Sequence, residues 1–172
     1  MKHYKITFIL LVLILGSCKP IYFYQTTRDR VQSSSKDNIE KIQFFNDEKI
    51  TIVYRTASRD ESITGGKVKF EEGYYNYYIT FPKKTPAVAK DLDEKRLKVY
   101  FESGEDKYLV FGKYDDGKYG LYGISEDDGF YVNFEGKRFK VIEGKWAELI
   151  IKKNIKIDVE SDKRKVKGVK VG

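Results

Sequence analysis

Tyr74-Tyr75-Asn76-Tyr77-Tyr78-Ile79-Thr80-Phe81 is the stretch of sequence that decides the fold class. Large aromatic or aliphatic side chains recur at every second position, which is the period of a β-strand with one buried face. Residues 67–70 alternate in the same way, and Glu71-Glu72-Gly73 can form a tight turn between the two segments. Together they predict an antiparallel hairpin. Tyr75, Tyr77, Ile79 and Phe81 share one face of the expected strand, and Tyr74, Asn76, Tyr78 and Thr80 share the other.

Upstream of this hairpin, residues 50–55 also alternate between two faces. Ile42 and Phe44 precede them, and Asn46-Asp47 is a pair of turn-forming residues, so the region predicts a second hairpin. Residues 57–66 are mostly polar and end in two glycines, which indicates a surface loop. Residues 82–95, which contain two prolines, are expected to form a crossing loop.

Downstream of residue 95 the sequence contains short alternating segments separated by turn residues. Strands at a spacing of about 8–12 residues are typical of an all-β meander, barrel or sandwich. We therefore predict an all-β domain, a compact antiparallel meander that closes into a small barrel or a sandwich. The expected strands are residues 96–102, 107–111, 118–124, 130–134, 138–142, 146–151 and 155–159.

Three of the expected turns share a pattern of two acidic residues, a glycine and a nearby tyrosine. Asp and Gly tolerate the positive φ angles of tight hairpin turns, and Tyr suits a half-buried strand. Clustered carboxylates can also bind Ca²⁺, but these lack the alternating ligand spacing and the closing glutamate of a calcium loop. We therefore expect structural turns and no metal site. The three segments are 71–75, 115–119 and 127–131.

The start of the sequence has the organisation of an export signal. Lys2 and Lys5 form a basic head, and residues 6–15 are apolar except for Thr7. This run is shorter than the roughly 20 residues that a helix needs to cross a membrane. We predict that residues 1–17 are a signal peptide that is cleaved before Cys18.

The four residues at the end of this segment, Leu15-Gly16-Ser17-Cys18, resemble the lipobox of bacterial lipoproteins. The cysteine thiol of a lipobox carries a diacylglycerol, so the resemblance implies a covalent lipid on Cys18 and no other cofactor. One acyl chain holds a protein only transiently, whereas the two or three that a lipobox implies would bind it to the membrane stably. The alternative is an ordinary secretory signal, with Cys18 as the first residue of a soluble product.

The segment that follows the cysteine contains three aromatic residues, Tyr22, Phe23 and Tyr24. A Ser-Cys pair soon followed by a Tyr-Phe-Tyr-Gln segment is similar to lipoproteins of the Bacteroidota. Either the rings lie at the level of the lipid headgroups, where amphipathic aromatic side chains are favourable, or they form a short strand that packs on the domain. Residues 31–38 are expected to be linker.

The expected organisation after the signal peptide has three parts. Residues 18–38 form a lipid-anchored tether, residues 39–160 form the β-domain, and residues 161–172 form a basic tail or an edge strand. Within the β-domain, residues 81–112 are similar to part of the small SH3-like barrels of exported bacterial proteins. The similarity rests on Phe81-Pro82-Lys83-Lys84-Thr85-Pro86, on residues 97–102 and on residues 108–112. It favours a barrel over a sandwich.

Histidine and cysteine each occur once in the sequence, as His3 and Cys18. Cleavage of the signal would remove His3, and no second cysteine exists that could form a disulfide within the domain. These two facts exclude a Ser-His-Asp triad, a Cys nucleophile and a zinc site of His or Cys ligands. A glycosidase needs only a pair of carboxylates, but nearly all acidic residues lie in expected turns. We expect no enzymatic activity.

The excess positive charge of the exported chain lies at its C-terminus. Residues 18–151 contain 23 Lys and Arg and 23 Asp and Glu, whereas residues 152–172 contain eight basic and three acidic residues. An acidic protein or the phosphates of lipids and lipopolysaccharide would suit such a tail. The other interpretation is a solvated edge strand whose lysines deter edge-to-edge pairing. Nucleic acid is not an expected partner. The candidate contact residues are Lys163, Arg164, Lys165, Lys167 and Lys170.

These features predict a lipid-anchored, non-catalytic accessory subunit of an outer-membrane protein complex for assembly, export or uptake. Surface-exported lipoproteins of the Bacteroidota often have a lysine followed by acidic residues after the cysteine. Here Lys19 is followed by Pro20 and Ile21, which favours a position facing the periplasm. Interface cores are enriched in aromatic residues. The tyrosines that could contact a partner are Tyr74, Tyr77, Tyr78, Tyr100, Tyr119 and Tyr122.

The alternative function is a glycan-binding or peptidoglycan-binding module. In such a module, exposed tyrosines and Trp146 would stack on the faces of sugar rings. Because Trp146 lies in an expected strand, we predict that it is buried in the core instead.

Overall fold

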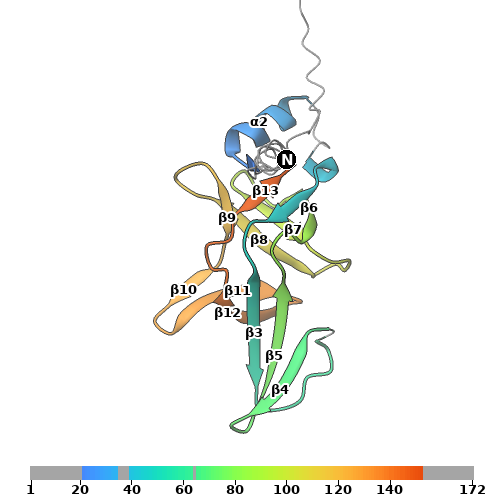
Figure 1. Cartoon of the computed structure of the whole chain (residues 1–172), viewed down its shortest axis with the longest axis vertical. Helices are drawn as coiled ribbons and strands as arrows, with labels where there is room; N and C mark the ends of the chain where they lie inside the picture. The colour runs from blue at the N-terminus through green and yellow to red at the C-terminus, as the bar shows by residue number, and fades with distance from the viewer. Residues whose placement is uncertain (1–20, 35–38, 64, 153–172) are drawn as a thin grey trace, which may run out of the picture.

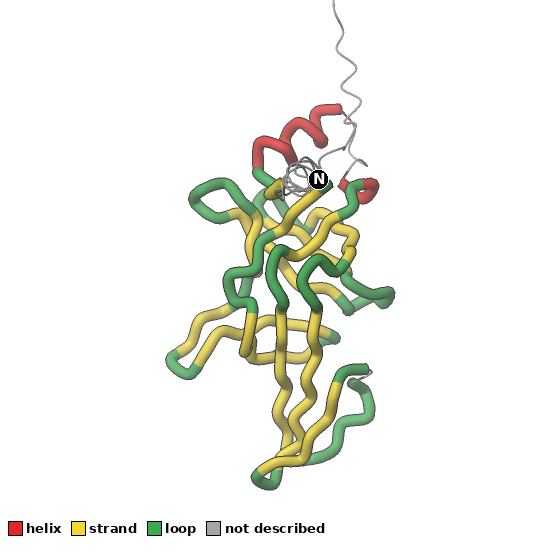
Figure 2. The backbone as a smooth tube through the Cα atoms, in the orientation of Figure 1, coloured by secondary structure: helices red, strands yellow, loops and turns green. Residues whose placement is uncertain are grey.

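The computed structural model describes residues 21–34, 39–63 and 65–152. In this part of the chain two antiparallel β-sheets share one hydrophobic core, with a single α-helix at one end (Figure 1). Strands account for most of the regular structure (Figure 2), so the prediction of an all-β domain is confirmed. No helix of the described residues is long and apolar enough to cross a bilayer. The strand expected at 155–159 lies outside these residues.

The seven-stranded sheet has the order β1-β13-β2-β6-β7-β8-β9, and the six-stranded sheet has the order β10-β11-β12-β3-β5-β4. The first sheet contains β1 (Ile21–Tyr22), β2 (Phe44–Asn46), β6 (Pro86–Asp91), β7 (Arg96–Tyr100), β8 (Tyr108–Lys113), β9 (Tyr119–Leu121) and β13 (Leu149–Ile151). The second contains β3 (Ile50–Thr56), β4 (Lys67–Glu71), β5 (Tyr74–Phe81), β10 (Ile124–Glu126), β11 (Gly129–Phe134) and β12 (Lys137–Glu143). The helical segments are α2 (Gln25–Ser34) and the 3-10 helix η1 (Ile39–Lys41).

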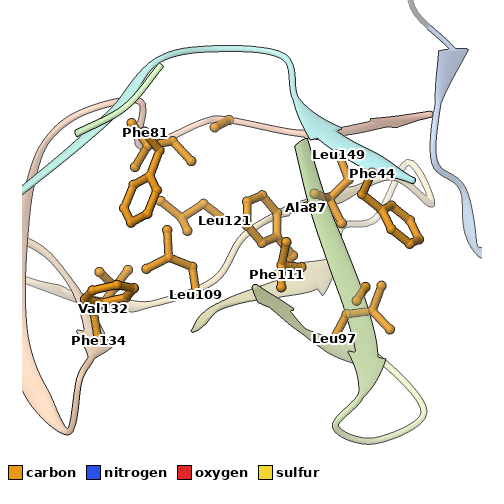
Figure 3. Packing of buried hydrophobic residues seen from close by; sticks show 14 of the residues in the cluster. Phe44, Phe81, Ala87, Leu97, Leu109, Phe111, Leu121, Val132, Phe134 and Leu149 are labelled. Atoms are coloured by element: carbon orange, nitrogen blue, oxygen red, sulfur yellow. The ribbon is translucent and has the colours of Figure 1, made fainter. Parts of the chain in front are cut away.

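The core lies where the two sheets meet, because the chain repeatedly passes from one sheet into the other. β2 leads into β3, β5 into β6, β9 into β10, and β12 into β13. At this junction the Phe81 ring lies 5.1 Å from the ring of Phe101 and 5.5 Å from that of Phe134, measured between centroids. Figure 3 shows Phe81 and Phe134 packed with Leu109, Leu121 and other core side chains. One continuous core therefore supports both sheets.

The two edges of the seven-stranded sheet approach each other. Isolated bridges join Tyr24 to Lys118 and Gly120 to Glu148. In addition, the amide of Tyr119 donates to the carbonyl of Phe23 over 3.2 Å. These contacts link β9 to the β1–β13 edge, but they do not form a continuous ladder. No closed barrel is therefore found among the described strands.

A buried asparagine, Asn46, ties together the points where two strands leave one sheet for the other. Its side-chain amide donates to the carbonyls of Glu48 and Pro82 over 2.6 and 2.8 Å, and to the carbonyl of Phe81 over 3.3 Å. Its side-chain oxygen accepts a hydrogen bond from the amide of Thr85 over 2.8 Å. The side chain is fully buried. It therefore satisfies backbone groups that the core would otherwise leave without partners.

The hairpin expected across Asn46-Asp47 is wrong for this reason. β2 pairs with β13 and β6, whereas β3 pairs with β12 and β5. The Asn46 side chain holds the β5–β6 crossing, so β2 does not fold back onto β3. The hairpin expected around Gly73 is confirmed, with β4 and β5 in register from Glu71↔Tyr74 to Lys67↔Tyr78.

The crossing loop expected at residues 82–95 is also wrong, because β6 occupies Pro86–Asp91. Ala87 and Ala89 point into the core, and Val88 and Lys90 point outward. Alanine has a low strand propensity, so the alternation carried little signal in the sequence. β6 lies between β2 and β7 in the seven-stranded sheet.

Residues 21–34 pack on the β-domain, in contrast to the expected tether. β1 pairs with β13, and Phe23 is fully buried with its ring 4.9 Å from that of Phe44. The helix α2 follows and buries Arg28 and Val31. The segment expected to be linker from residue 31 therefore begins with the last turn of a helix.

The side chain of Arg28 joins α2 to the end of β6 and to the loop between β6 and β7 through hydrogen bonds. Its guanidinium donates to the hydroxyl of Tyr119 over 2.8 Å and to the carboxylate of Asp91 over 2.6 Å. It also donates to the carbonyls of Asp93 and Glu94, over 2.5 and 2.8 Å. The arginine is only 1% exposed, so its charge is stabilised by these partners in place of water.

Replacing Asn46 by alanine is expected to lower the free energy of unfolding by about 3 kcal/mol, since it leaves several buried carbonyl and amide groups without this partner. Urea denaturation measures the change. Asn133, an exposed asparagine on β11, provides the matched control. Asn133→Ala should alter the free energy of unfolding by less than about 0.5 kcal/mol. Equal effects of the two substitutions would contradict the role given to Asn46.

Candidate interaction surface

The meander of β6, β7, β8 and β9 has one face in the core and one face toward solvent. The core face carries aliphatic and aromatic side chains that are almost fully buried. These are Ala87, Ala89, Leu97, Val99, Leu109 and Phe111. The alternate residues of the same strands point outward, and most of them are tyrosine, lysine or arginine.

The register of the strands brings these outward side chains together. Lys90 lies opposite Lys98, and Tyr100 lies opposite Tyr108. Tyr122 follows β9, and a Cβ placed on Gly112 would come within 2.9 Å of its ring, so a larger residue at this position would displace the tyrosine. We call this surface the tyrosine–lysine face. It consists of Lys90, Arg96, Lys98, Tyr100, Tyr108 and Tyr122.

Each tyrosine of this face has a cation over its ring. The Nζ of Lys98 lies 4.6 Å from the centroid of Tyr108, and the Nζ of Lys90 lies 5.9 Å from that of Tyr100. The guanidinium carbon of Arg96 lies 5.5 Å from the centroid of Tyr122. The Tyr100 and Tyr108 rings are 5.4 Å apart. Cation–π contacts of this kind orient the charges without neutralising them.

Lys90 and Lys98 differ from most cations on the outer face of the six-stranded sheet. There, lysine and arginine pair with carboxylates, as in Lys49–Glu143 at 2.7 Å and Arg138–Glu126. Within the described part of the chain, no carboxylate lies within ion-pair distance of Lys90 or Lys98. These two ammonium groups are therefore available to an anionic partner.

Arg96 is held at one end of the face by Asp93. The guanidinium donates to the carboxylate over 2.7 Å. This hydrogen bond, together with one from the backbone amide of Lys95, lowers the pKa of Asp93, and the same carboxylate raises the pKa of Arg96. Asp93 and Arg96 are both charged at neutral pH. Their opposite charges cancel at this end of the face, and the hydrogen bond between them fixes the position of the guanidinium.

A hollow lies at each end of the face. One, of about 530 Å³, is lined by Val88, Lys90, Tyr100 and the residues up to Glu105. The other, of about 410 Å³, is lined by Arg96, Gly112 and Tyr122 together with neighbouring loop residues. Both are open and shallow, which suits side chains of a partner more than an enclosed small molecule.

The structure places the predicted tyrosines in three different environments. Tyr77 and Tyr119 are buried, so the prediction that they contact a partner is wrong for these two. Tyr74 and Tyr78 lie on the outer face of the six-stranded sheet, next to Arg55 and Lys69 respectively. Of the six tyrosines predicted to contact a partner, Tyr100 and Tyr122 alone belong to the tyrosine–lysine face.

The residues of this face that the sequence analysis missed are Tyr108 and the three cations. Their outward direction follows from the same alternation that predicted the strands. The sequence does not show that β6 exists or that it pairs with β7, and without that pairing Lys90 cannot be placed beside Lys98.

The three residues expected to lie near a membrane also differ from one another. Phe23 belongs to the core. Tyr22 is half-buried beneath the Nζ of Lys118, which lies 4.7 Å from its centroid, and burial raises the pKa of its hydroxyl. Tyr24 is partly exposed. Phe23 therefore packs on the domain. Of the three residues, Tyr22 and Tyr24 keep their rings at the surface.

Cys18 and the five basic residues of the predicted tail lie outside the described residues. The tail residues are Lys163, Arg164, Lys165, Lys167 and Lys170. Their proposed roles therefore stay predictions. Among the residues that the structure describes, no group of three or more His, Cys, Asp or Glu side chains could hold a metal ion.

The prediction that Trp146 is buried is wrong. Its side chain is 66% exposed, in the turn that precedes β13. The Nζ of Lys145 lies 4.9 Å from the centroid of Trp146 and 5.3 Å from that of Phe130. Only Leu149–Ile151 forms the strand that was expected from residue 146, so the tryptophan is left outside the core.

Comparison with protein-family models finds no match for the chain. No curated protein and no solved structure gives a significant match either. The geometry described above is therefore the basis for the proposals that follow.

Proposed function

We propose that this protein is a lipid-anchored, non-catalytic accessory subunit of an outer-membrane protein complex, and that a partner subunit docks on its tyrosine–lysine face. The observation that carries the proposal is the pair of lysines, Lys90 and Lys98, without carboxylate partners beside half-buried tyrosines on an outward face. Tyr and Arg are enriched in protein interfaces, and charge complementarity favours association with an acidic surface.

The distance from the proposed anchor to the domain supports a position close to the membrane. Only Lys19 and Pro20 lie between Cys18 and β1. A lipid on Cys18 would therefore hold the β1–β13 edge of the seven-stranded sheet beside the bilayer, on the periplasmic side of the outer membrane. The basic residues at 163–170 would add attraction to an acidic partner or to lipid phosphates.

We also infer that the seven-stranded sheet acts as a barrel-like docking module, comparable with an SH3-like barrel. The isolated bridges between its edges support this inference. Curling of the sheet would make the outer face of β6–β9 convex and accessible, while the core side chains stay enclosed.

Replacing Cys18 by serine is expected to release the protein from membranes into the periplasmic fraction, because the acyl chains that bind it would not be attached. Cell fractionation followed by immunoblotting measures this. The released domain should keep the far-UV circular dichroism of a β protein. Continued membrane association in high salt would show that the covalent lipid is not the anchor.

Charge reversal on the face, by Lys90→Glu combined with Lys98→Glu, is expected to lower partner recovery about tenfold or more, since two attractive contacts become repulsive. Cross-linking in intact cells, followed by purification through a C-terminal tag, measures the recovery. Lys41→Glu combined with Lys83→Glu, at two exposed lysines elsewhere, is the matched control. Equal recovery from both double variants, or a wild-type protein recovered alone, would refute this mode of docking.

A second candidate function is binding of glycans or peptidoglycan, and the exposure of Trp146 favours it. An exposed indole can stack on the apolar face of a sugar ring, and Lys145 beside it could contact an anionic substituent. The same Nζ lies 5.3 Å from the centroid of Phe130, a half-buried ring near the site.

Trp146 is the single tryptophan of the chain, so its fluorescence reports on this site alone. The free protein should emit at the long wavelength of a solvated indole. Titration with soluble peptidoglycan fragments should shift the emission to shorter wavelength if sugars cover the ring. An unchanged spectrum at saturating fragment concentration would eliminate Trp146 as a sugar-binding residue.

A further inference from the structure

The strand β4 is an edge of the six-stranded sheet, at the end of the molecule farthest from α2 (Figure 1). All five of its residues are exposed. They include two apolar side chains, Val68 at 49% and Phe70 at 62% exposure. Exposed apolar residues on an edge strand are unusual, because such edges can pair with another strand.

The outer edge of β4 has free backbone groups at these two apolar positions. Glu72 and Gly73 form a two-residue turn with positive φ angles of 52° and 80°, so Glu71 and Tyr74 close the hairpin as a hydrogen-bonded pair. Alternation along an antiparallel ladder then directs the amides and carbonyls of Val68 and Phe70 away from β5. In the described chain, no backbone hydrogen bond joins them to another segment.

The loop that leads from β3 to β4 is held against the inner face of the sheet. The amide of Asp60 donates to the hydroxyl of Tyr77 over 2.5 Å, and the carboxylate of Asp60 pairs with Lys137 at 2.9 Å. Ile63 is buried in the core cluster. These contacts direct the loop onto β5 and β12, so it makes no ladder with the edge of β4.

We propose that β4 pairs with β4 of a second copy of this chain, antiparallel and about a two-fold axis at Lys69. In this register Lys67 lies opposite Glu71 of the second copy, and Val68 lies opposite Phe70. Both relations occur twice because of the symmetry. The free amides and carbonyls of Val68 and Phe70 would bond to each other, and the two six-stranded sheets would become one continuous sheet.

The self-complementarity of the sequence Lys67-Val68-Lys69-Phe70-Glu71 is what identifies the partner as a second copy. Lysines on an edge strand normally deter pairing, but here Lys67 meets a glutamate. Opposite charges and apolar pairs directly across a ladder are stabilising. Lys69 meets its own symmetry mate, which opposes pairing. Its Nζ, however, already lies 3.5 Å from Glu71 of its own chain and 5.5 Å from the Tyr78 ring.

Five residue pairs form a small contact, so we expect a reversible dimer. Cysteines introduced one at a time into the full chain, in which Cys18 is common to every variant and to the control, test the register in intact cells under a thiol oxidant. Residue 69 would face its own mate at about 4.5 Å between Cα atoms. Residues 67 and 71 would lie about 13 Å or more from theirs, at about 3.4 Å per residue of displacement along the strand. A disulfide requires Cα atoms within about 7 Å.

Lys69→Cys should therefore give a species of twice the mass on a non-reducing gel, and Lys67→Cys and Glu71→Cys should give at least tenfold less. Lys140→Cys, on the outer face of the same sheet, controls for random collision. Equal yields from all four variants, or no dimer from Lys69→Cys, would overturn the proposal. Stronger cross-linking through residue 67 or 71 would overturn it too, because those residues pair only in another register.

Charge reversal provides an independent test in the Lys69→Cys background. Lys67→Glu would place two glutamates opposite each other on both sides of the axis, so the yield of disulfide dimer should fall severalfold. Adding Glu71→Lys restores opposite charges and should recover the yield. If Lys67→Glu leaves the yield unchanged, or if the double reversal does not rescue it, the proposed pairing is wrong. Both side chains are exposed, so the charge reversals should leave the fold intact.

Discussion

The arrangement of the two sheets depends on the hydrogen bonds of the buried side chain of Asn46. This one residue bonds to the backbone on both sides of the β5–β6 crossing and to the segment between β2 and β3. A crossing of two strands necessarily interrupts their ladders, which leaves backbone amides and carbonyls without partners in the core. An asparagine supplies both donors and an acceptor in one compact group. The shared core of the two sheets can form because this interruption is satisfied.

The sequence predicted strands well where alternation was strong and predicted connections poorly. Tyr74–Phe81 forms β5, in which Tyr77, Ile79 and Phe81 are buried as the alternation requires, although Asn76 is buried as well. The sequence predicted the wrong partner strands at Asn46. An asparagine in a sequence indicates a turn, but it does not show whether the side chain faces water or bonds to the backbone of two buried crossings between sheets. The helix α2 was missed for a related reason. It buries Arg28, whose partners come from distant parts of the chain.

The candidate surface could be predicted only in part, because alternation tells which residues share a face but not which faces stay open. Tyr100 and Tyr119 look alike in the sequence, yet one is on the tyrosine–lysine face and the other receives a hydrogen bond from Arg28 in the core. Trp146 shows the converse. Its sequence context resembles a strand, and a turn before β13 leaves the ring in solvent. Whether a side chain is exposed depends on which strands pair, and those strands come from distant parts of the sequence.

The pairing of β1 with β13 has a consequence for the kinetics of folding. These are the first and last strands of the described chain, and they are neighbours in one sheet. A chain made from its N-terminus can assemble the β4–β5 hairpin and the β6–β9 meander early, because those contacts are local. The seven-stranded sheet, in contrast, cannot be completed until residue 151 has emerged. High contact order at this edge makes its closure a late and slow step, and until then the amide of Phe23 lacks the carbonyl of Leu149, to which it donates over 2.8 Å.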